Sequence, residues 1–203
     1  MSNDAPSVRD NPLPPTHRVA DPGPLGLAAF AMTTFALSVS NADIWGPAVS
    51  TALALALVYG GAIQVFAGMW EFARRNTFGA LAFTSYGAFW ISYYVLVKFI
   101  LPGVAKADVA TVVGVFLLGW TIFTAYMFVS TLRLSVALVV VFGLLVVTFV
   151  LLTVGAFQGT ASLTKAGGWF GVATAAGAWY ASFAGVTNET FGKAVLPIGS
   201  LSR

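Results

Sequence analysis

The sequence has no cysteine, a single histidine and very few charged residues. Without cysteine the chain can form no disulfide, no thiolate nucleophile and no cysteine-ligated metal site. The one histidine, His17, lies in a proline-rich stretch and cannot build a metal site alone. Charged residues make up 8% of the chain, whereas soluble domains carry roughly 25%. These shortages exclude a water-facing surface, so we expect a lipid-embedded protein that binds no metal or other cofactor.

The few charges are poorly placed for catalysis or for binding nucleic acid. Ten Lys and Arg exceed seven Asp and Glu by too little to indicate a nucleic-acid partner. The acidic residues that flank apolar segments fall at the predicted segment ends: Asp43, Asp108, Glu71 and Glu189. Glu71 precedes Arg74 and Arg75 at a spacing that predicts a surface ion pair on a helix. With no paired carboxylates on one helix face, we expect neither an ion pump nor an enzyme.

Hydrophobic residues, at 58% of the chain, gather in stretches long enough to cross a membrane. A transmembrane helix needs about 20 apolar residues, and backbone hydrogen bonding in lipid allows few other structures. We therefore predict an all-α integral membrane protein with about six transmembrane helices per protomer. The predicted spans are residues 24–41, 46–70, 78–100, 109–130, 134–156 and 167–187.

The pattern divides the chain into three regions with a defined orientation. Residues 1–21 are polar and proline-rich and lack the apolar core of a secretory signal, which favours a flexible cytoplasmic tail. Residues 22–192 form the transmembrane domain, and residues 193–203 form a short cytoplasmic tail. Cytoplasmic flanks collect Lys and Arg, and alternating helices place seven basic residues on one side and three on the other: Arg9, Arg18, Arg74, Arg75, Arg133, Lys193 and Arg203, against Lys98, Lys106 and Lys165. Both termini are therefore predicted in the cytoplasm, in a multi-pass protein of the plasma membrane or the bacterial inner membrane.

Neutral hydrogen-bonding groups and aromatic residues follow one face of several predicted helices. Phe30, Thr34 and Asn41 do so on the first helix, and Tyr86 and Trp90 on the third. Such a lining suits a narrow path for a small, partly polar solute. The predicted path residues are Thr34, Asn41, Gln64, Thr84 and Trp90. Core packing or an interfacial belt is the alternative role for the aromatics, and helix-to-helix hydrogen bonding is the alternative for Gln64.

The entry to the first predicted helix carries the strongest local signal. Residues Asp21, Pro22, Pro24, Leu25, Gly26 and Leu27 follow one another there, with Gly23 between the prolines. Pro22 and Pro24 remove donors that a helix N-terminus would leave unpaired, and Asp21 can cap the helix. Helix N-termini attract anions, so this entry suits a carboxylate, although a plain helix start explains the same residues.

Several motifs resemble those of the acetate uptake transporter family. The run Pro22-Gly23-Pro24-Leu25-Gly26-Leu27 resembles the family signature Asn-Pro-x-Pro-Leu-Gly-Leu. A longer match covers residues 60–64, 66–72, 76–79 and 82–90, and further agreement comes at 123–132 and 188–197. The resemblance extends over everything after the tail. Asp21 stands where the signature has Asn, which adds a negative charge near a carboxylate path.

The resemblance implies a six-helix protomer with its own path, assembly as a ring of six, and transport of acetate with some succinate linked to protons. By carry-over it implies a hydrophobic constriction at Phe30, Tyr86 and Leu145. Burying an unpaired carboxylate is very costly, so such a constriction favours the protonated acid, or an anion that keeps some water and takes hydrogen bonds from Tyr86, Gln64 and Asn41. The alternatives are a channel for a small neutral solute, such as urea, a short amide or ammonia, and a sensor that binds a carboxylate without moving it.

Overall fold

The computed structural model describes residues 19–201. Most of the predicted tail 1–21, including His17, Arg9 and Arg18, lies outside this range, as does Arg203. Within it, regular structure is helical apart from one isolated β-bridge, between Ser135 and Ser200. Two segments, η1 and η2, are π-helical, and η3 is a 3₁₀ turn. The elements in chain order are α1 (Gly23–Asn41), α2 (Ala48–Leu57), η1 (Val58–Ile63), α3 (Gln64–Ala73), α4 (Thr77–Val95), η2 (Leu96–Ile100), η3 (Leu101–Gly103), α5 (Val109–Thr131), α6 (Val136–Gln158) and α7 (Ala161–Phe191).

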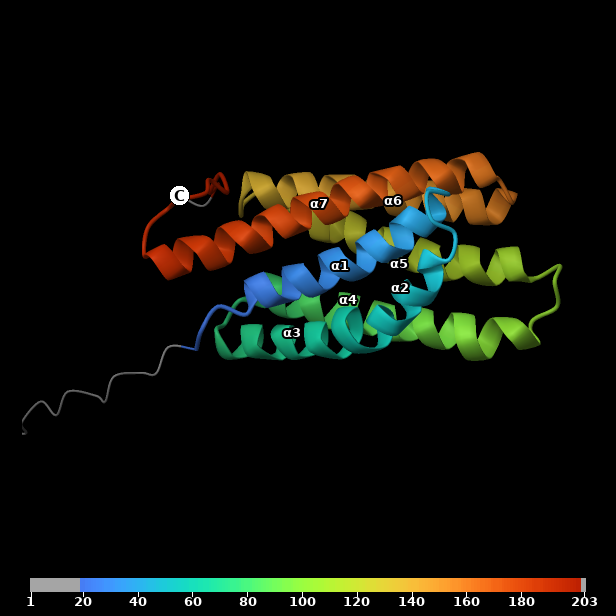
Figure 1. Ribbon diagram of the computed structural model, residues 1–203, viewed down its shortest axis with the longest axis horizontal. Helices are drawn as coiled ribbons and strands as arrows, with labels where there is room; N and C mark the ends of the chain where they lie inside the picture. Colours follow the sequence, from blue (N-terminus) through green and yellow to red (C-terminus); the bar gives the residue numbers. More distant parts are fainter. Residues whose placement is uncertain (1–18, 202–203) are drawn as a thin grey trace, which may run out of the picture.

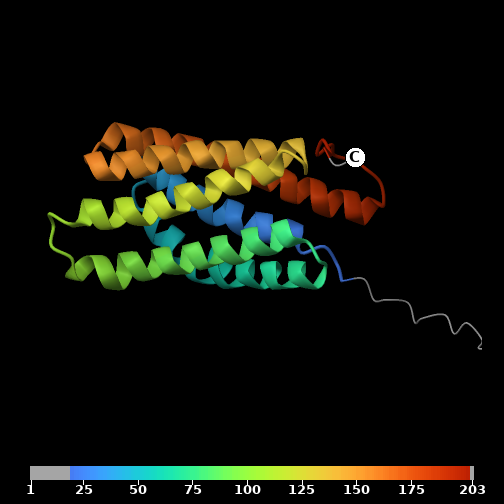
Figure 2. The same cartoon turned by 180° about the vertical axis from the view of Figure 1, so that it is seen from behind.

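The helices lie side by side along one long axis and form a bundle (Figure 1). The segments α2–η1–α3 and α4–η2–η3 are each continuous, so the described chain crosses the bundle six times. α1 packs along α7, α3 packs along α4, and α5 packs along α6. Figure 2 shows the opposite face, where α4, α5 and α6 lie in front. The first and last described residues lie at the same end of the bundle (Figure 1), which an even number of crossings requires.

Five of the six predicted spans are confirmed as helices long and apolar enough to cross a membrane. They are Gly23–Asn41, Ala48–Ala73, Thr77–Gly103, Val109–Thr131 and Val136–Gln158. The sixth, predicted at 167–187, lies within α7, whose 31 residues are long enough but less apolar than the other five. Small residues and the polar ends of α7 lower its hydropathy, and its buried face carries mostly Gly, Ala, Ser and Thr. These small side chains let α7 approach α1 and α6 closely.

Local sequence explains where most of the helices begin and end. The Asn76 side chain accepts a hydrogen bond from Gly79 N at 3.1 Å, and Ser135 accepts one from Leu138 N at 3.3 Å. Both are side-chain N-caps, and they fix the first turns of α4 and α6. Gly159 and Gly192 have φ near +60° and end α6 and α7, because glycine adopts this left-handed conformation without steric cost.

A π-helical break interrupts the second span at Gly60 and Gly61. A β-carbon on Gly60 would lie 2.7 Å from Thr33 Cβ on α1, and one on Gly61 would lie 2.8 Å from Ile91 Cγ1 on α4. The two glycines therefore let the backbone approach both neighbouring helices. The break precedes Gln64 directly, so it helps to set the direction in which this amide points.

An aromatic core joins the helices, and large apolar side chains cover the outside. Tyr86 contacts the rings of Phe30, Trp120, Phe123 and Phe142, with centroid distances from 5.3 to 6.2 Å. The outer surface exposes many large hydrophobic residues, among them Phe66, Trp70, Val115, Ile122, Val129 and Phe183. An exposed apolar surface on this scale fits lipid and does not fit water.

Candidate functional site

A cavity of about 230 Å³ opens between α1, α3, α4, α6 and α7. Its wall is mostly apolar, and the polar side chains on it are few: Asp21, Gln64, Glu71, Asn76, Tyr86 and Ser135. The structure brings the three predicted constriction residues, Phe30, Tyr86 and Leu145, together on this wall. Concave, mainly apolar sites with a few convergent polar groups are typical of small-molecule sites.

Phe30 and Tyr86 form the aromatic contact at the inner part of this cavity. Their ring centroids are 5.6 Å apart, and both side chains, like Leu145, are buried. The Thr124 hydroxyl donates to the Trp120 carbonyl at 2.7 Å, so the Tyr86 hydroxyl, 3.0 Å away, donates to Thr124. Tyr86 therefore directs its hydroxyl toward α5 and offers the cavity mainly its ring. This geometry supports an apolar constriction more than a hydrogen-bonding role for Tyr86.

One helical turn beyond this contact lie Thr34 and Trp90. α1 and α4 start at the same end of the bundle and touch at successive levels, since Gly26 packs on the Phe83 ring and Phe30 packs on Tyr86. Thr34 follows Phe30 by four residues, and Trp90 follows Tyr86 by four, so both continue the same faces. Thr34 Oγ1 and Trp90 Nε1 are buried without a hydrogen-bond partner in the described chain. Such groups are rare in native interiors and call for an explanation.

Gln64 is the third buried polar group of this kind. Its side chain is 1% exposed, lines the cavity, and leaves Oε1 without a hydrogen-bond partner in the described part of the chain. A buried amide that bonded neighbouring helices would have used this oxygen. Gln64 Oε1 therefore makes no helix-to-helix hydrogen bond within the described chain, and its contact with a solute stays a prediction.

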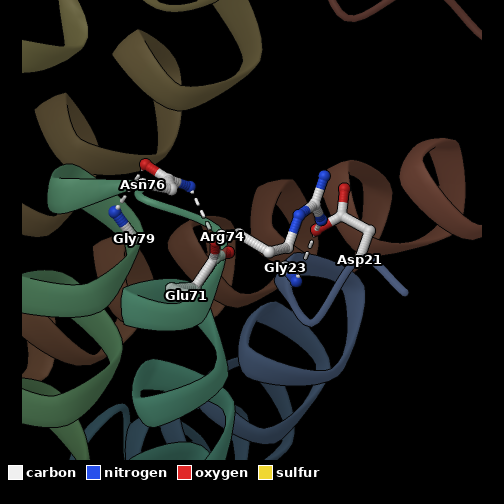
Figure 3. A network of polar contacts seen from close by, with 6 residues as sticks. All are labelled: Asp21, Gly23, Glu71, Arg74, Asn76 and Gly79. Carbon is white, nitrogen blue, oxygen red and sulfur yellow. Dashed lines mark hydrogen bonds and ion pairs between the residues drawn. The ribbon is translucent and has the colours of Figure 1, made fainter. Parts of the chain in front are cut away.

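A polar network surrounds the end of the cavity where α1 and α4 begin (Figure 3). Arg74 pairs with Asp21 at 2.5 Å, and Asp21 Oδ1 accepts a hydrogen bond from Gly23 N at 2.9 Å. Asn76 Nδ2 donates to Glu71 Oε2 at 2.9 Å, while Asn76 Oδ1 accepts from Gly79 N. Asp21 thus bonds the first residue of α1 from outside the helix, while the N-cap position itself is Pro22 and carries no side-chain cap. The predicted surface pair of Glu71 with Arg74 or Arg75 is wrong, because Arg74 reaches Asp21 and Glu71 turns inward to Asn76.

A second cavity, of about 770 Å³, lies at the opposite end of the bundle. Asn41 lines it together with Asp43, Lys106 and Lys165. Lys165 Nζ lies 2.8 Å from Asp43 Oδ2, and this hydrogen bond, with the charge of Lys165, holds the pKa of Asp43 below its ordinary value. Asn41 is thus far along α1 from Phe30, at the other mouth of the predicted path.

The remaining predicted site residues occupy different surroundings. Thr84 lies at the α3–α4 contact, where a β-carbon on Gly68 would come within 2.5 Å of Thr84 N, and it lines neither cavity described above. Its hydroxyl donates to the Ala80 carbonyl. Of the helix-entry residues, Pro24 and Leu27 line the first cavity, Pro22 and Gly26 are buried, and Leu25 is exposed. Their predicted roles in transport, like those of the constriction residues, stay predictions.

Two features of the cavity escaped the sequence analysis. Glu71 is 2% exposed and lines the wall, although its position at a segment end suggested a surface residue. Ile198 reaches the wall from the C-terminal segment, which Val136 N and Ala137 N hold through hydrogen bonds to Gly199 O at 2.8 Å and Ile198 O at 3.1 Å. The sequence could have predicted the burial of Glu71, because it is the one charged residue in the otherwise apolar run Val65–Phe72. No sequence feature predicts that Ile198 reaches the cavity.

Comparison with known proteins decides the family. The sequence profile of the GPR1/FUN34/yaaH family matches residues 7–203. The chain belongs to the GPR1/FUN34/yaaH family. A family member from Escherichia coli K12, the succinate-acetate/proton symporter SatP, is 41% identical over 182 residues, which are 90% of this chain and 96% of that protein.

Two further matches place the chain within the family. The ammonia transport outward protein 2 of Saccharomyces cerevisiae is 41% identical over 86% of this chain, and this chain spans 64% of that protein's length. A solved structure described as that of the bacterial acetate channel SatP superposes with a TM-score of 0.84 and 41% identity, covering 90% of this chain and 100% of the other.

Proposed function

We propose that this chain is a membrane transporter or channel for acetate and related small carboxylates, succinate among them, with movement linked to protons. The observation that carries the proposal is the cavity itself. On its wall, a buried Gln64 amide oxygen with no hydrogen-bond partner among residues 19–201 lies together with the rings of Phe30 and Tyr86. A small acid fits both surfaces, since it offers a methyl or methylene group and a hydrogen-bonding head. The names of the E. coli relative and of the solved structure support this substrate class.

The path runs from the cavity at the α1 and α4 starts, past Phe30, Tyr86 and Leu145, to the second cavity at Asn41. Gln64 serves the near side of the constriction. Thr34 and Trp90, whose polar groups have no partner in the described part of the chain, serve the far side. Trp90 Nε1 is a donor only, and the Thr34 hydroxyl both donates and accepts. A carboxyl group that leaves the constriction therefore meets two buried hydrogen-bonding groups. Thr34 lies one helical turn after Phe30 on α1, and Trp90 lies one turn after Tyr86 on α4.

The proton linkage follows from the apolar constriction. Moving an unpaired carboxylate between Phe30, Tyr86 and Leu145 costs far more than moving the neutral acid. The Tyr86 hydroxyl is already committed to Thr124, so it does not offset this cost. The species that passes the rings is therefore the protonated acid.

Acetate uptake into proteoliposomes tests the function. Radiolabelled acetate should enter faster than into protein-free liposomes, and formate, propionate and succinate should compete while urea should not. Flux should fall as the external pH rises from about 5 to 8, across which a carboxylic acid loses its protonated form. A flux that does not change over this range would overturn the proton linkage, and binding without flux would indicate a carboxylate sensor.

A channel for ammonia is the second candidate, and the name of the yeast relative favours it. The same narrow aromatic path suits a small neutral solute. The discriminating measurement is internal alkalinisation of proteoliposomes after an ammonium pulse, compared with acidification after an acetate pulse. An acetate response without an ammonium response would exclude this alternative.

The family resemblance further supports a ring of six protomers, each with its own path, in a cell membrane with both termini in the cytoplasm. In this orientation the first cavity faces the cytoplasm and the second faces outward. The described basic residues fit this orientation, since Arg74 lies at the start of α1 through its pair with Asp21, whereas Lys106 and Lys165 line the opposite cavity.

A further inference from the structure

Glu71 is a buried carboxyl group on the wall of the first cavity, and it makes no ion pair with any described residue. Its side chain is 2% exposed and lines the cavity wall. The ion pairs of the described chain join Arg74 to Asp21 and Lys165 to Asp43, and none reaches Glu71. Buried charges in proteins are normally paired. An unpaired carboxyl on the wall of a cavity therefore indicates a group that the protein uses.

The first turns of two helices enclose this carboxyl. A β-carbon on Gly79, in the first turn of α4, would lie 2.8 Å from Glu71 Oε1, and one on Gly23, at the start of α1, would lie 3.5 Å from the same atom. The absence of a side chain at Gly79 leaves room for the carboxyl, whereas a β-carbon on Gly23 would only touch it. Asn76 Nδ2 donates to its other oxygen at 2.9 Å (Figure 3). Helix N-termini and an amide donor tolerate the ionised form, so the site can hold Glu71 in either protonation state.

Gln64 supplies an independent indication that this wall binds a ligand. It precedes Glu71 by seven residues on α3, two helical turns, and both side chains line the same cavity. Its Oε1 atom is buried and accepts no hydrogen bond from the described chain. An acceptor left open in this place fits a donor on the ligand, which a protonated carboxyl group provides.

We propose that Glu71 and the carboxyl group of the substrate share one proton in this cavity, which makes Glu71 the proton-binding residue of the transport cycle. The inference rests on the proposed function. Two carboxylates close together in a site of low polarity cannot both stay ionised. When a substrate anion enters beside ionised Glu71, one proton from bulk water binds to the pair. A hydronium ion loses one O–H bond and becomes water, one O–H bond forms on the pair, and the proton later leaves with the neutral acid or returns to water.

The other charges around Glu71 balance each other. Asp21 precedes α1, and Arg74 follows α3, and they neutralise each other at 2.5 Å. Arg75 is exposed, and the cavity-lining residues that come from α4, α6 and α7 carry no charge. Among the described residues, Glu71 is therefore the carboxyl of this wall that makes no ion pair, and a substrate carboxyl can approach it.

Glu71→Gln tests the proposal, because the amide keeps an acceptor for Asn76 and supplies donors that pair directly with an anion. The measurement is the KM for radiolabelled acetate in proteoliposomes with equal internal and external pH, from about pH 5 to 8, with the flux through protein-free liposomes subtracted. In the parent, KM should increase as the pH is raised, and the slope should approach about tenfold per pH unit, because one proton binds together with the substrate. In Glu71→Gln, KM should stay nearly constant.

Three outcomes separate this proposal from the proposed function. A flat profile in Glu71→Gln beside a steep one in the parent supports it. Equally steep profiles would show that the neutral acid binds without Glu71, which overturns the inference and leaves acetate transport intact. A parent that moves no acetate above protein-free liposomes would remove the proposed function and this inference with it.

Asn76→Asp keeps the test decisive if Glu71→Gln does not fold. Asp retains the acceptor that caps α4 through Gly79 N, but it replaces the donor to Glu71 with a second carboxyl. The pH at which KM begins to rise should then move upward, because a neighbouring carboxylate favours the protonated pair. A merely structural Glu71 predicts an unchanged pH profile, and that result would overturn the inference.

Discussion

Unpartnered polar atoms in buried positions are the residue-scale feature that separates this bundle from a simply packed one. Thr34 Oγ1, Gln64 Oε1 and Trp90 Nε1 are such atoms in the described chain. Leaving a buried donor or acceptor unpaired costs about 1–3 kcal/mol, so a structural role would have supplied partners. They lie on either side of the Phe30–Tyr86 contact, where the proposed path would supply the missing partners.

Gln64→Leu should reduce transport more than stability. The amide oxygen makes no hydrogen bond within the described chain, so its loss removes little, and buried polar contacts in membrane interiors average about 0.6 kcal/mol. Acetate uptake in proteoliposomes and a melting curve in detergent should be measured on the same preparation. Normal uptake beside a collapsed melting temperature would assign Gln64 to helix packing.

Phe30→Ala should loosen selectivity while the protein remains folded. Removing a Phe from a packed core costs roughly 3–5 kcal/mol, but Phe30 borders a cavity of about 230 Å³ that water can enter, so the loss should be far smaller. The ratio of succinate to acetate uptake should rise above that of the parent. Phe35→Ala is the matched control, since Phe35 lies on the same helix and packs on Trp179 at 5.3 Å, outside the cavity wall. An unchanged ratio with a strongly lowered melting temperature would place Phe30 in the core.

The sequence placed Phe30 and Tyr86 on faces that the structure brings to one cavity wall, but it did not predict the inward turn of Glu71. Phe30 and Tyr86 follow the period of their helices, and periodicity predicts which face a residue shares. The direction of Glu71 depends on Gly79 and Asn76 at the start of α4, whereas Glu71 itself lies near the end of α3. No local pattern describes such a tertiary arrangement. Helical spacing alone therefore paired Glu71 with the nearest arginines.

At the element scale, glycine sets how closely the helices approach. A β-carbon on Gly168 of α7 would lie 2.7 Å from Ala42 Cα, at the end of α1. A β-carbon on Gly119 of α5 would meet nothing within 4 Å. Both are helical glycines, but Gly168 is tightly packed against another helix end and Gly119 faces open space.

Gly168→Ala should destabilise the bundle, and Gly119→Ala should not. The added methyl group at position 168 meets backbone, which cannot rotate away, and overpacking of this kind costs roughly 1–3 kcal/mol. Thermal unfolding in one detergent, followed by tryptophan fluorescence, compares the two variants with the parent. Equal melting temperatures for the two variants would show that α1 and α7 separate easily and that their contact is not tight.

Helix positions were predictable from apolar length, whereas the extent of α7 and the π-helical breaks were not. The prediction for the last helix, 167–187, missed its first turns from Ala161, because Ser162, Thr164 and Lys165 read as a polar loop. In the structure these residues are helical. Gly159 ends α6, the connection is short, and α7 begins at Ala161. In the π-helical segments η1 and η2 each turn contains more residues than an α-helical turn. The hydropathy of a segment does not reveal such a change in helix type.

At the scale of the whole molecule, the charges lie at the two ends and the apolar side chains lie between them. Arg74 and Asp21 mark one end, and Asp43, Lys106 and Lys165 mark the other. The two cavities open at these opposite ends, and the Phe30–Tyr86 contact lies on the first cavity's wall between them. A protein that moves a solute between two aqueous phases needs a polar, water-accessible opening at each end and an apolar barrier between them.

The absence of cysteine makes the orientation directly measurable. Lys193→Cys lies just after α7, at the end where the described chain begins and ends, and Lys106→Cys lies in the segment before α5, at the opposite end. Both side chains are exposed, so a membrane-impermeant maleimide should reach each one from a single side. In intact cells we expect rapid labelling of Lys106→Cys and none of Lys193→Cys, with the pattern reversed in inside-out vesicles. The charge asymmetry requires this result, because arginine and lysine are retained on the cytoplasmic flank. Labelling of both positions from the same side would mean that α7 does not cross the membrane, and its lower hydropathy would then be the cause.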